Sequence, residues 1–294
     1  MDSLKQYLAE EVGVDHADGL ISRREALRRL ALLGLGAAAS GSILAACARD
    51  DTTAPVVTSS PSGPVPSGVP AESITFPGPN GTLQAAWAAA PTAKGGVLVI
   101  HENRGLTDHI RSVAGRFAAS GYSALAVDLL SEEGGTAKLG GEAEAQAALG
   151  KAPRERFVAD MKAALTELAK RTPGKKLAAV GFCFGGGMVW RLLASGEPRL
   201  AAAAPFYGPA PDDPDFSGSK NAAVLGIYAE QDDRVNASRP TIEAALKKAG
   251  LTHEIVTFPA VDHAFFNDTG GRYNAEQARR AYDKVLEWFA AHAA

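Results

Sequence analysis

A cysteine stands at the centre of the residues in this chain that could do chemistry. Cys183 lies in the run Gly-Phe-Cys-Phe-Gly-Gly over residues 181–186, directly after the apolar residues 177–180. The pattern predicts a buried strand, a sharp turn with the thiol at its apex, and a helix behind it. Flanking glycines let neighbouring backbone approach such a strained turn, and the positive end of the helix favours the thiolate. Cys183 is therefore a candidate nucleophile, and the alternative is a buried structural cysteine in a glycine-rich connection.

A carboxylate and a histidine follow two later apolar runs. Asp232 comes after residues 224–228, and His263 comes after residues 254–258. Because sites in open α/β sheets lie beyond the carboxyl ends of the strands, both side chains are expected near the thiol. The imidazole would take the thiol proton and return it to the leaving alkoxide, while the carboxylate would fix the tautomer of the imidazole. The order nucleophile, acid, histidine is typical of α/β-hydrolases.

Two other aspartates in the sequence could orient the histidine in place of Asp232. Asp233 is adjacent to Asp232, and Asp262 precedes His263. The alternative for the whole acidic cluster is a solvated loop, and the alternative for His263 is a histidine on a surface loop.

A second carboxylate, Glu102, follows the apolar run 97–100. A carboxylate at the end of a buried strand is costly unless it is paired. It is predicted to lie beside the site, and the alternative is a salt bridge to Arg104. The backbone N–H groups of Phe184 and Asn103 are the candidate oxyanion hole.

The chain from residue 71 onward alternates predicted strands and helices. This alternation predicts an α/β protein with the α/β-hydrolase fold, a doubly wound and mostly parallel sheet with helices on both faces. The predicted strands are 74–76, 83–87, 97–100, 123–127, 177–180, 201–206, 224–228 and 254–258. Helices are predicted at 108–120, 154–171, after the cysteine to 195, 241–249 and 278–289, with a glycine-rich loop over 133–141.

Together these residues resemble the dienelactone hydrolase family, the carboxymethylenebutenolidases. The resemblance covers about residues 71 to 292, and residues 101–106 resemble the exported bacterial branch of the family. It is carried by the segments 99–102, 181–186, 230–232 and 263–268.

The resemblance implies a hydrolase of a lactone or small ester, a carboxylic ester hydrolase that needs no cofactor and no metal. It implies Cys183 as nucleophile, Asp232 and His263 as its partners, and Glu102 as the residue that poises the thiol. In the family, substrate entering the site displaces the Glu102 carboxylate, and this carboxylate takes the thiol proton. The thiolate attacks the carbonyl, and either water or the released enolate resolves the acyl-thioester.

The chain departs from the family where arginines bind the carboxylate of dienelactone. Residues 128–133 are Asp-Leu-Leu-Ser-Glu-Glu at one such place, and Phe266 and Asn267 stand at the other. Arg104 and Arg272 are candidate replacements. The candidate substrate-binding residues are Arg104, Arg272, Tyr207, Phe265 and Phe266.

Residues 1–47 have the pattern of a bacterial export signal. Arg23 and Arg24 precede an uncharged stretch over 30–46, which ends in small residues before Cys47. The pattern resembles a twin-arginine signal joined to a lipobox, so Cys47 is predicted to carry lipid after cleavage. This predicts an exported protein of the bacterial cell envelope or periplasm, held at the membrane through the lipid alone. The alternatives are a retained transmembrane helix and a cytosolic amphipathic helix.

The remaining organisation follows from composition. Residues 48–70 are rich in Pro, Ser and Thr and predict a disordered linker before a catalytic domain over 71–294. The net charge of −3 and the absence of a basic stripe exclude nucleic acid as a partner, which leaves a small-molecule substrate. Three alternatives remain: ligand binding without turnover, redox sensing by Cys183, and a metal site of His101, Glu102 and His263.

Overall fold

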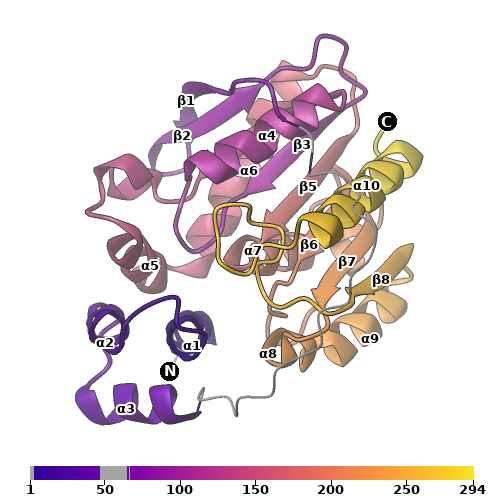
Figure 1. Cartoon of the computed structure of the whole chain (residues 1–294). Helices are drawn as coiled ribbons and strands as arrows, with labels where there is room; N and C mark the ends of the chain where they lie inside the picture. Colours follow the sequence, from indigo (N-terminus) through magenta and orange to yellow (C-terminus); the bar gives the residue numbers. More distant parts are fainter. Residues whose placement is uncertain (1–2, 47–64, 66) are drawn as a thin grey trace.

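An eight-stranded sheet forms the centre of the molecule (Figure 1). The structure is a computed structural model, and it describes residues 3–46, 65 and 67–294. The strand order is β1-β2-β4-β3-β5-β6-β7-β8. The strands are β1 (Glu72–Gly78), β2 (Gly81–Ala88), β3 (Gly95–Ile100), β4 (Tyr122–Asp128), β5 (Leu177–Phe182), β6 (Leu200–Phe206), β7 (Ala223–Ala229) and β8 (His253–Phe258).

The sheet is mixed, with an antiparallel edge and a parallel body. β1 and β2 form a hairpin across the register pair Gly78 and Gly81, and β2 pairs antiparallel with β4. All the other neighbours pair in parallel. β3, β4, β5 and β7 are buried along their whole length, as strands covered on both faces must be. This architecture confirms the predicted α/β-hydrolase fold.

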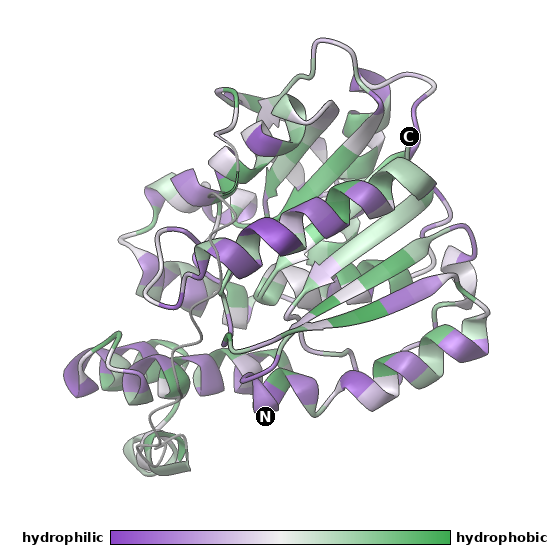
Figure 2. Ribbon diagram, turned by 45° about the vertical axis from the view of Figure 1, so that its right-hand side comes forward, coloured by the Kyte–Doolittle hydropathy of each residue, from purple (hydrophilic) through white to green (hydrophobic). Residues whose placement is uncertain are grey.

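Helices cover both faces of the sheet. α4 (Asp108–Ala119) and α10 (Ala275–His292) lie in front of it in Figure 1, and α6 (Arg154–Arg171) and α7 (Phe184–Ala194) lie behind. Figure 2 shows the reason in the sequence: the strands are mostly hydrophobic, while the helices alternate hydrophobic and hydrophilic residues along their length. The other helices of the domain are α5 (Glu142–Lys151), α8 (Asp233–Asn236) and α9 (Arg239–Ala249).

Apart from the short helix α8, which was not predicted, the predicted elements of the domain are confirmed with one addition. α6 spans the predicted range and buries its apolar stripe, which includes Phe157, Met161 and Leu165. The addition is α5, which follows the glycine-rich segment 133–141 and was not predicted. Its Ala-rich sequence gives a weak amphipathic pattern, although five of its ten residues are buried.

Three helices precede the sheet: α1 (Ser3–Ala17), α2 (Arg23–Leu32) and α3 (Ala37–Ala46). They pack on one another and on α5 through buried Leu8, Val12 and Leu30. An export signal over residues 1–47 is expected to have no role in the fold, so the sequence did not predict this packing. Among the described residues, no helix is both long and apolar enough to cross a bilayer. Cys47 and most of the predicted linker lie outside the described residues.

Candidate active site

Cys183 lies at a strained turn between β5 and α7. Its φ is 57° and its ψ is −120°, a conformation that L-residues rarely adopt. Its N–H donates to the carbonyl of Phe206 on β6 at 3.1 Å, which fixes the turn against the next strand. A Cβ at Gly185 would lie 2.3 Å from the carbonyl oxygen of Ile100, so only glycine fits there. The strand, turn and helix predicted around the cysteine are confirmed.

His263 and Asp232 form a buried pair beside the sulfur. His263 Nδ1 and Asp232 Oδ2 lie 2.5 Å apart, and a ring nitrogen of His263 lies within 4.8 Å of Cys183 Sγ. Asp232 Oδ1 also accepts from the N–H of Val235, because Asp232 caps the short helix α8. The structure therefore brings together the three residues predicted from their positions after β5, β7 and β8.

The geometry separates Asp232 from its two competitors. Asp233 is the first residue of α8 and is exposed. Asp262 accepts the backbone N–H of His263 at 2.6 Å through Oδ1. Of these three carboxylates, Asp232 is the one whose oxygen bonds the His263 ring.

The charge state of His263 is set by its buried surroundings. Burial alone would lower its pKa, but the charges of Asp232 and Cys183 and hydrogen bonds to both raise the pKa to about 9. Asp232 holds the proton on Nδ1, so Nε2 is the nitrogen that exchanges a proton with the site. Because part of this rise comes from the charge on Cys183, the imidazole keeps, at neutral pH, a proton that it has taken from the thiol.

Glu102 is buried and is paired with Asn267. Its Oε2 accepts from Asn267 Nδ2 at 2.6 Å, and both residues line the cavity at Cys183. The alternative salt bridge to Arg104 is wrong, because Arg104 pairs with Glu142 on α5 at 2.9 Å. Asn267 was noticed only as the residue that stands in place of a family arginine. Its role as the donor to Glu102 was missed.

His101 takes no part in a metal site with Glu102 and His263. Its Nε2 accepts from the N–H of Leu129 at 3.1 Å, so the proton is on Nδ1, which donates to the Glu102 carbonyl at 2.6 Å. Burial lowers the pKa of His101, which keeps the ring neutral. Both ring nitrogens are engaged with backbone, so the metal alternative is wrong for this residue.

Comparison with known proteins identifies the family of this chain. A model of the "Dienelactone hydrolase family" matches residues 83–293. The Salmonella typhi protein named "Putative carboxymethylenebutenolidase" is 31% identical over 265 residues, which cover 80% of this chain and 97% of that protein. The chain belongs to the dienelactone hydrolase family. It is a dienelactone hydrolase-like hydrolase, and the family implies a small-molecule substrate.

Solved structures show the same fold. The crystal structure of a "Putative Dienelactone Hydrolase" from Klebsiella pneumoniae has a TM-score of 0.67 at 29% identity, covering 76% of this chain and 98% of that chain. A dienelactone hydrolase-like promiscuous phosphotriesterase from metagenomic libraries has a TM-score of 0.63 at 22% identity, with the same coverage. The family match begins at residue 83, so it does not account for α1, α2 and α3.

The candidate oxyanion hole of this family member lies where the loop after β3 meets α7. Phe184 is the first residue of α7, so its N–H has no acceptor within the helix. A Cβ at Gly185 would lie 2.6 Å from the His101 carbonyl, which shows how closely the two segments approach. Asn103 follows in that loop and lines the cavity at Cys183.

The aromatic candidates for substrate binding are core residues. Phe265 packs on Tyr207 with ring centres 5.6 Å apart, and Phe266 packs on Phe182 at 4.9 Å. All three candidates are fully buried, and none of them lines the cavity at Cys183. Tyr207 supports the ring of His263 from 4.9 Å. The structure therefore does not bring Phe265, Phe266 and Tyr207 to the cavity surface, where the prediction that they bind substrate requires them.

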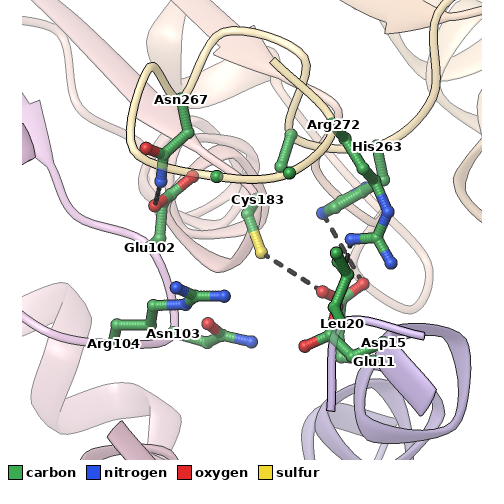
Figure 3. A pocket seen from close by; sticks show the side chains of 13 residues that line it. Glu11, Asp15, Leu20, Glu102, Asn103, Arg104, Cys183, His263, Asn267 and Arg272 are labelled. Atoms are coloured by element: carbon green, nitrogen blue, oxygen red, sulfur yellow. Dashed lines mark hydrogen bonds and ion pairs between the residues drawn. The ribbon is translucent and has the colours of Figure 1, made fainter. Parts of the chain in front are cut away.

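Side chains from α1 complete the site, and no sequence pattern indicates their presence there. Tyr7 Oη lies 3.2 Å from Cys183 Sγ, and the thiol donates to Glu11 Oε2 at 3.8 Å. Glu11 is ion-paired with Arg234 and lies 3.5 Å from His263 Nε2. Figure 3 shows the sulfur and the imidazole both linked to Glu11. Arg272, a substrate-binding candidate, lines the same cavity but bonds Asp15 and Asp18.

Proposed function

We propose that this protein hydrolyses a lactone or small ester through Cys183, with an acyl-thioester intermediate. The observation that carries the proposal is the Cys183 sulfur at a strand-to-helix turn within 4.8 Å of a His263 nitrogen. Asp232 supports the proposal because it bonds the other ring nitrogen of that imidazole, Nδ1. Sulfur, imidazole and carboxylate in this relation form a general nucleophile–base–orienter set.

Each step can be assigned to residues of this chain. His263 Nε2 takes the thiol proton, and the thiolate attacks the carbonyl carbon of the substrate. The N–H groups of Phe184 and Asn103 receive the oxyanion. When the C–O bond breaks, the leaving alkoxide takes the proton from Nε2. Water then attacks the thioester, Nε2 accepts its proton, and the C–S bond breaks to release the acid and the thiolate.

Glu102 would control the thiol before substrate enters. Its carboxylate is buried in the same cavity and is oriented by Asn267. An acyl group that enters the cavity brings its own polar atoms beside this carboxylate. The family resemblance implies that Glu102 accepts the thiol proton at that point, and the position of Glu102 in the same cavity as Cys183 supports this role.

Trapping the intermediate tests the proposal. The full chain is mixed with a p-nitrophenyl ester, quenched in acid and digested, and the peptides are analysed by mass spectrometry. We expect one acyl group on the peptide that contains Cys183, and its removal by neutral hydroxylamine, which cleaves thioesters. Acylation of a serine or lysine peptide instead, with the Cys183 peptide unmodified, would contradict a cysteine nucleophile.

We propose further that the protein is exported and carries lipid on Cys47. Arg23 and Arg24, the uncharged stretch 30–46 and the small residues before Cys47 support this. In a bacterial host, the mature chain is then expected in the membrane fraction with a lipid-modified N-terminus at Cys47. A Cys47→Ser variant is the control and should lack the lipid. An intact Met1 on soluble wild-type protein would refute export.

A further inference from the structure

The carboxylate of Glu11 stands between the candidate nucleophile and the candidate base. One of its oxygens accepts from Cys183 Sγ at 3.8 Å, and the other lies 3.5 Å from His263 Nε2 (Figure 3). A substrate carbonyl must lie about 3 Å from the nucleophile and within reach of the base. Glu11 thus occupies the place where the reacting group would have to be.

Arg234 holds Glu11 in that place. The guanidinium is ion-paired with the Glu11 carboxylate and lies 4.6 Å from the centre of the Tyr7 ring. The hydroxyl of Tyr7 reaches the sulfur at 3.2 Å from the next turn of the same helix. Because a buried carboxylate is costly without a partner, this pairing shows that α1 fits the site specifically and does not merely rest on it.

A second anchor lies at the other end of α1. Arg272 Nη1 donates to Asp15 Oδ1 at 3.0 Å, and Arg272 Nε donates to Asp18 Oδ2 at 2.7 Å. The guanidinium is largely buried, with 12% of its side chain exposed, so these ion pairs are shielded from solvent. Asp15 and Asp18 touch neither Cys183 nor His263 in the described hydrogen bonds and ion pairs.

Apolar contacts fix α1 from the side of α5. Leu4, Leu8 and Val12 are buried, and the side-chain amide of Gln146 donates to the Leu8 carbonyl at 3.1 Å. α2 adds Arg28 and Arg29, which pair with Glu144 and Glu142 on α5. α1 and α2 therefore dock on the domain as a unit.

The space left at the nucleophile is too small for an ester. The cavity lined by Glu11, Asp15, Cys183, His263 and Arg272 has a volume of about 40 Å³ for a water-sized sphere. That holds a few waters, since one water needs roughly 10–15 Å³ on this measure. Pockets that bind drug-sized organic ligands are commonly about 300–1,000 Å³.

We propose that α1 is an autoinhibitory element that closes the active site, and that substrate reaches Cys183 only when α1 leaves. The activity part of this inference rests on the proposed function, whereas the closure of Cys183 does not. α1 lies within the residues that precede Cys47, so cleavage at the predicted site would remove it. The full chain is then a closed precursor, and the chain that begins at Cys47 is the open enzyme.

The first test weakens the anchor at Arg272 in the full chain. The double variant Asp15→Asn with Asp18→Asn removes two charges and leaves Tyr7 and Glu11 in place. We expect alkylation of Cys183 by iodoacetamide to become about tenfold faster, which corresponds to about 1.4 kcal/mol in the opening equilibrium. Peptide mapping separates modification of Cys183 from that of Cys47. Hydrolysis of a p-nitrophenyl ester should rise by the same factor, because both reactions need the open form.

Asp283→Asn is the matched control. It breaks an ion pair of the same kind, to Arg279 Nε at 2.8 Å, on the exposed side of α10. Both rates should equal those of the wild type. Far-UV circular dichroism of each variant checks that the fold is kept.

The second test cuts the folded chain. A site-specific protease sequence is inserted within residues 47–64, the purified chain is cut, and the N-terminal fragment is removed by gel filtration. Alkylation of Cys183 should then be faster than in the uncut chain, independently of how the Asn variant folds. Unchanged alkylation in the variant and in the separated cut chain would overturn the proposal. Faster alkylation without hydrolysis of any ester would uphold closure by α1 and would refute the proposed function instead.

Discussion

Cys183→Ala is expected to lower kcat for a p-nitrophenyl ester by roughly 10⁴- to 10⁶-fold, the loss seen when a hydrolase loses its nucleophile. The methyl group has no proton to give and cannot form the acyl intermediate. Only the N–H groups of Phe184 and Asn103 and substrate binding would remain, which accounts for a small residual rate. The measurement is kcat from initial rates at saturating ester, in the wild type and in the Asp15→Asn, Asp18→Asn background.

The second background matters because closure by α1 would limit the rate of the wild type. The chain also offers a matched control, since its one other cysteine is Cys47. Measured on the full, uncleaved chain, Cys47→Ser should leave kcat unchanged in both backgrounds. A Cys183→Ala variant that keeps more than about a tenth of kcat, a loss of under about 1.4 kcal/mol in barrier, would place the nucleophile elsewhere.

The parallel body of the sheet could be predicted because its local signals agree. β3, β5 and β7 are short apolar runs buried on both faces. β3 and β7 are followed at once by polar residues, and β5 is followed at once by Cys183. Parallel strands bring their carboxyl ends to one edge, so residues far apart in the sequence meet there. This logic placed Cys183, Asp232 and His263 together without any knowledge of their contacts.

The sequence could not tell which face a side chain takes at the end of a strand. Asp232 and Asp233 are chemically identical neighbours, and only the capping position in α8 turns Asp232 toward the imidazole. Phe265 and Phe266 follow His263 directly, but both turn inward and pack in the core. The backbone direction at a single residue decides whether a side chain points into the site or into the core. The apolar character of the residue alone does not predict this direction.

The position of α1 could not be predicted from the sequence, for a different reason. Its contacts join residues that are very distant in the chain, such as Glu11 with Arg234, which are 223 positions apart. The helix itself has no strong amphipathic pattern, since its acidic and apolar residues face several partners at once. Arg23, Arg24 and the stretch 30–46 carry a targeting pattern, whereas no motif in the preceding residues indicates a contact with the site.

Asp232→Asn should lower kcat by about 10³- to 10⁴-fold while leaving the shape of the site intact. The amide would donate its N–H to His263 Nδ1, which forces the ring proton onto Nε2. Nε2 could then no longer accept the proton of Cys183. Asp233→Asn, one residue further and exposed, is the matched control and should keep nearly full kcat, because Asp233 does not touch the imidazole.

The pH dependence distinguishes this role from a structural one. Burial lowers the pKa of His263, and the charge of Asp232 is the first of the effects that raise it to about 9. Without that charge, the pKa of His263 should fall, so the ring loses its proton at lower pH than in the wild type. NMR titration of the His263 ring measures the shift directly. A variant whose kcat falls while the His263 pKa stays near 9 would show that Asp232 holds only the backbone of α8, because a carboxylate that orients and charges the imidazole must change both.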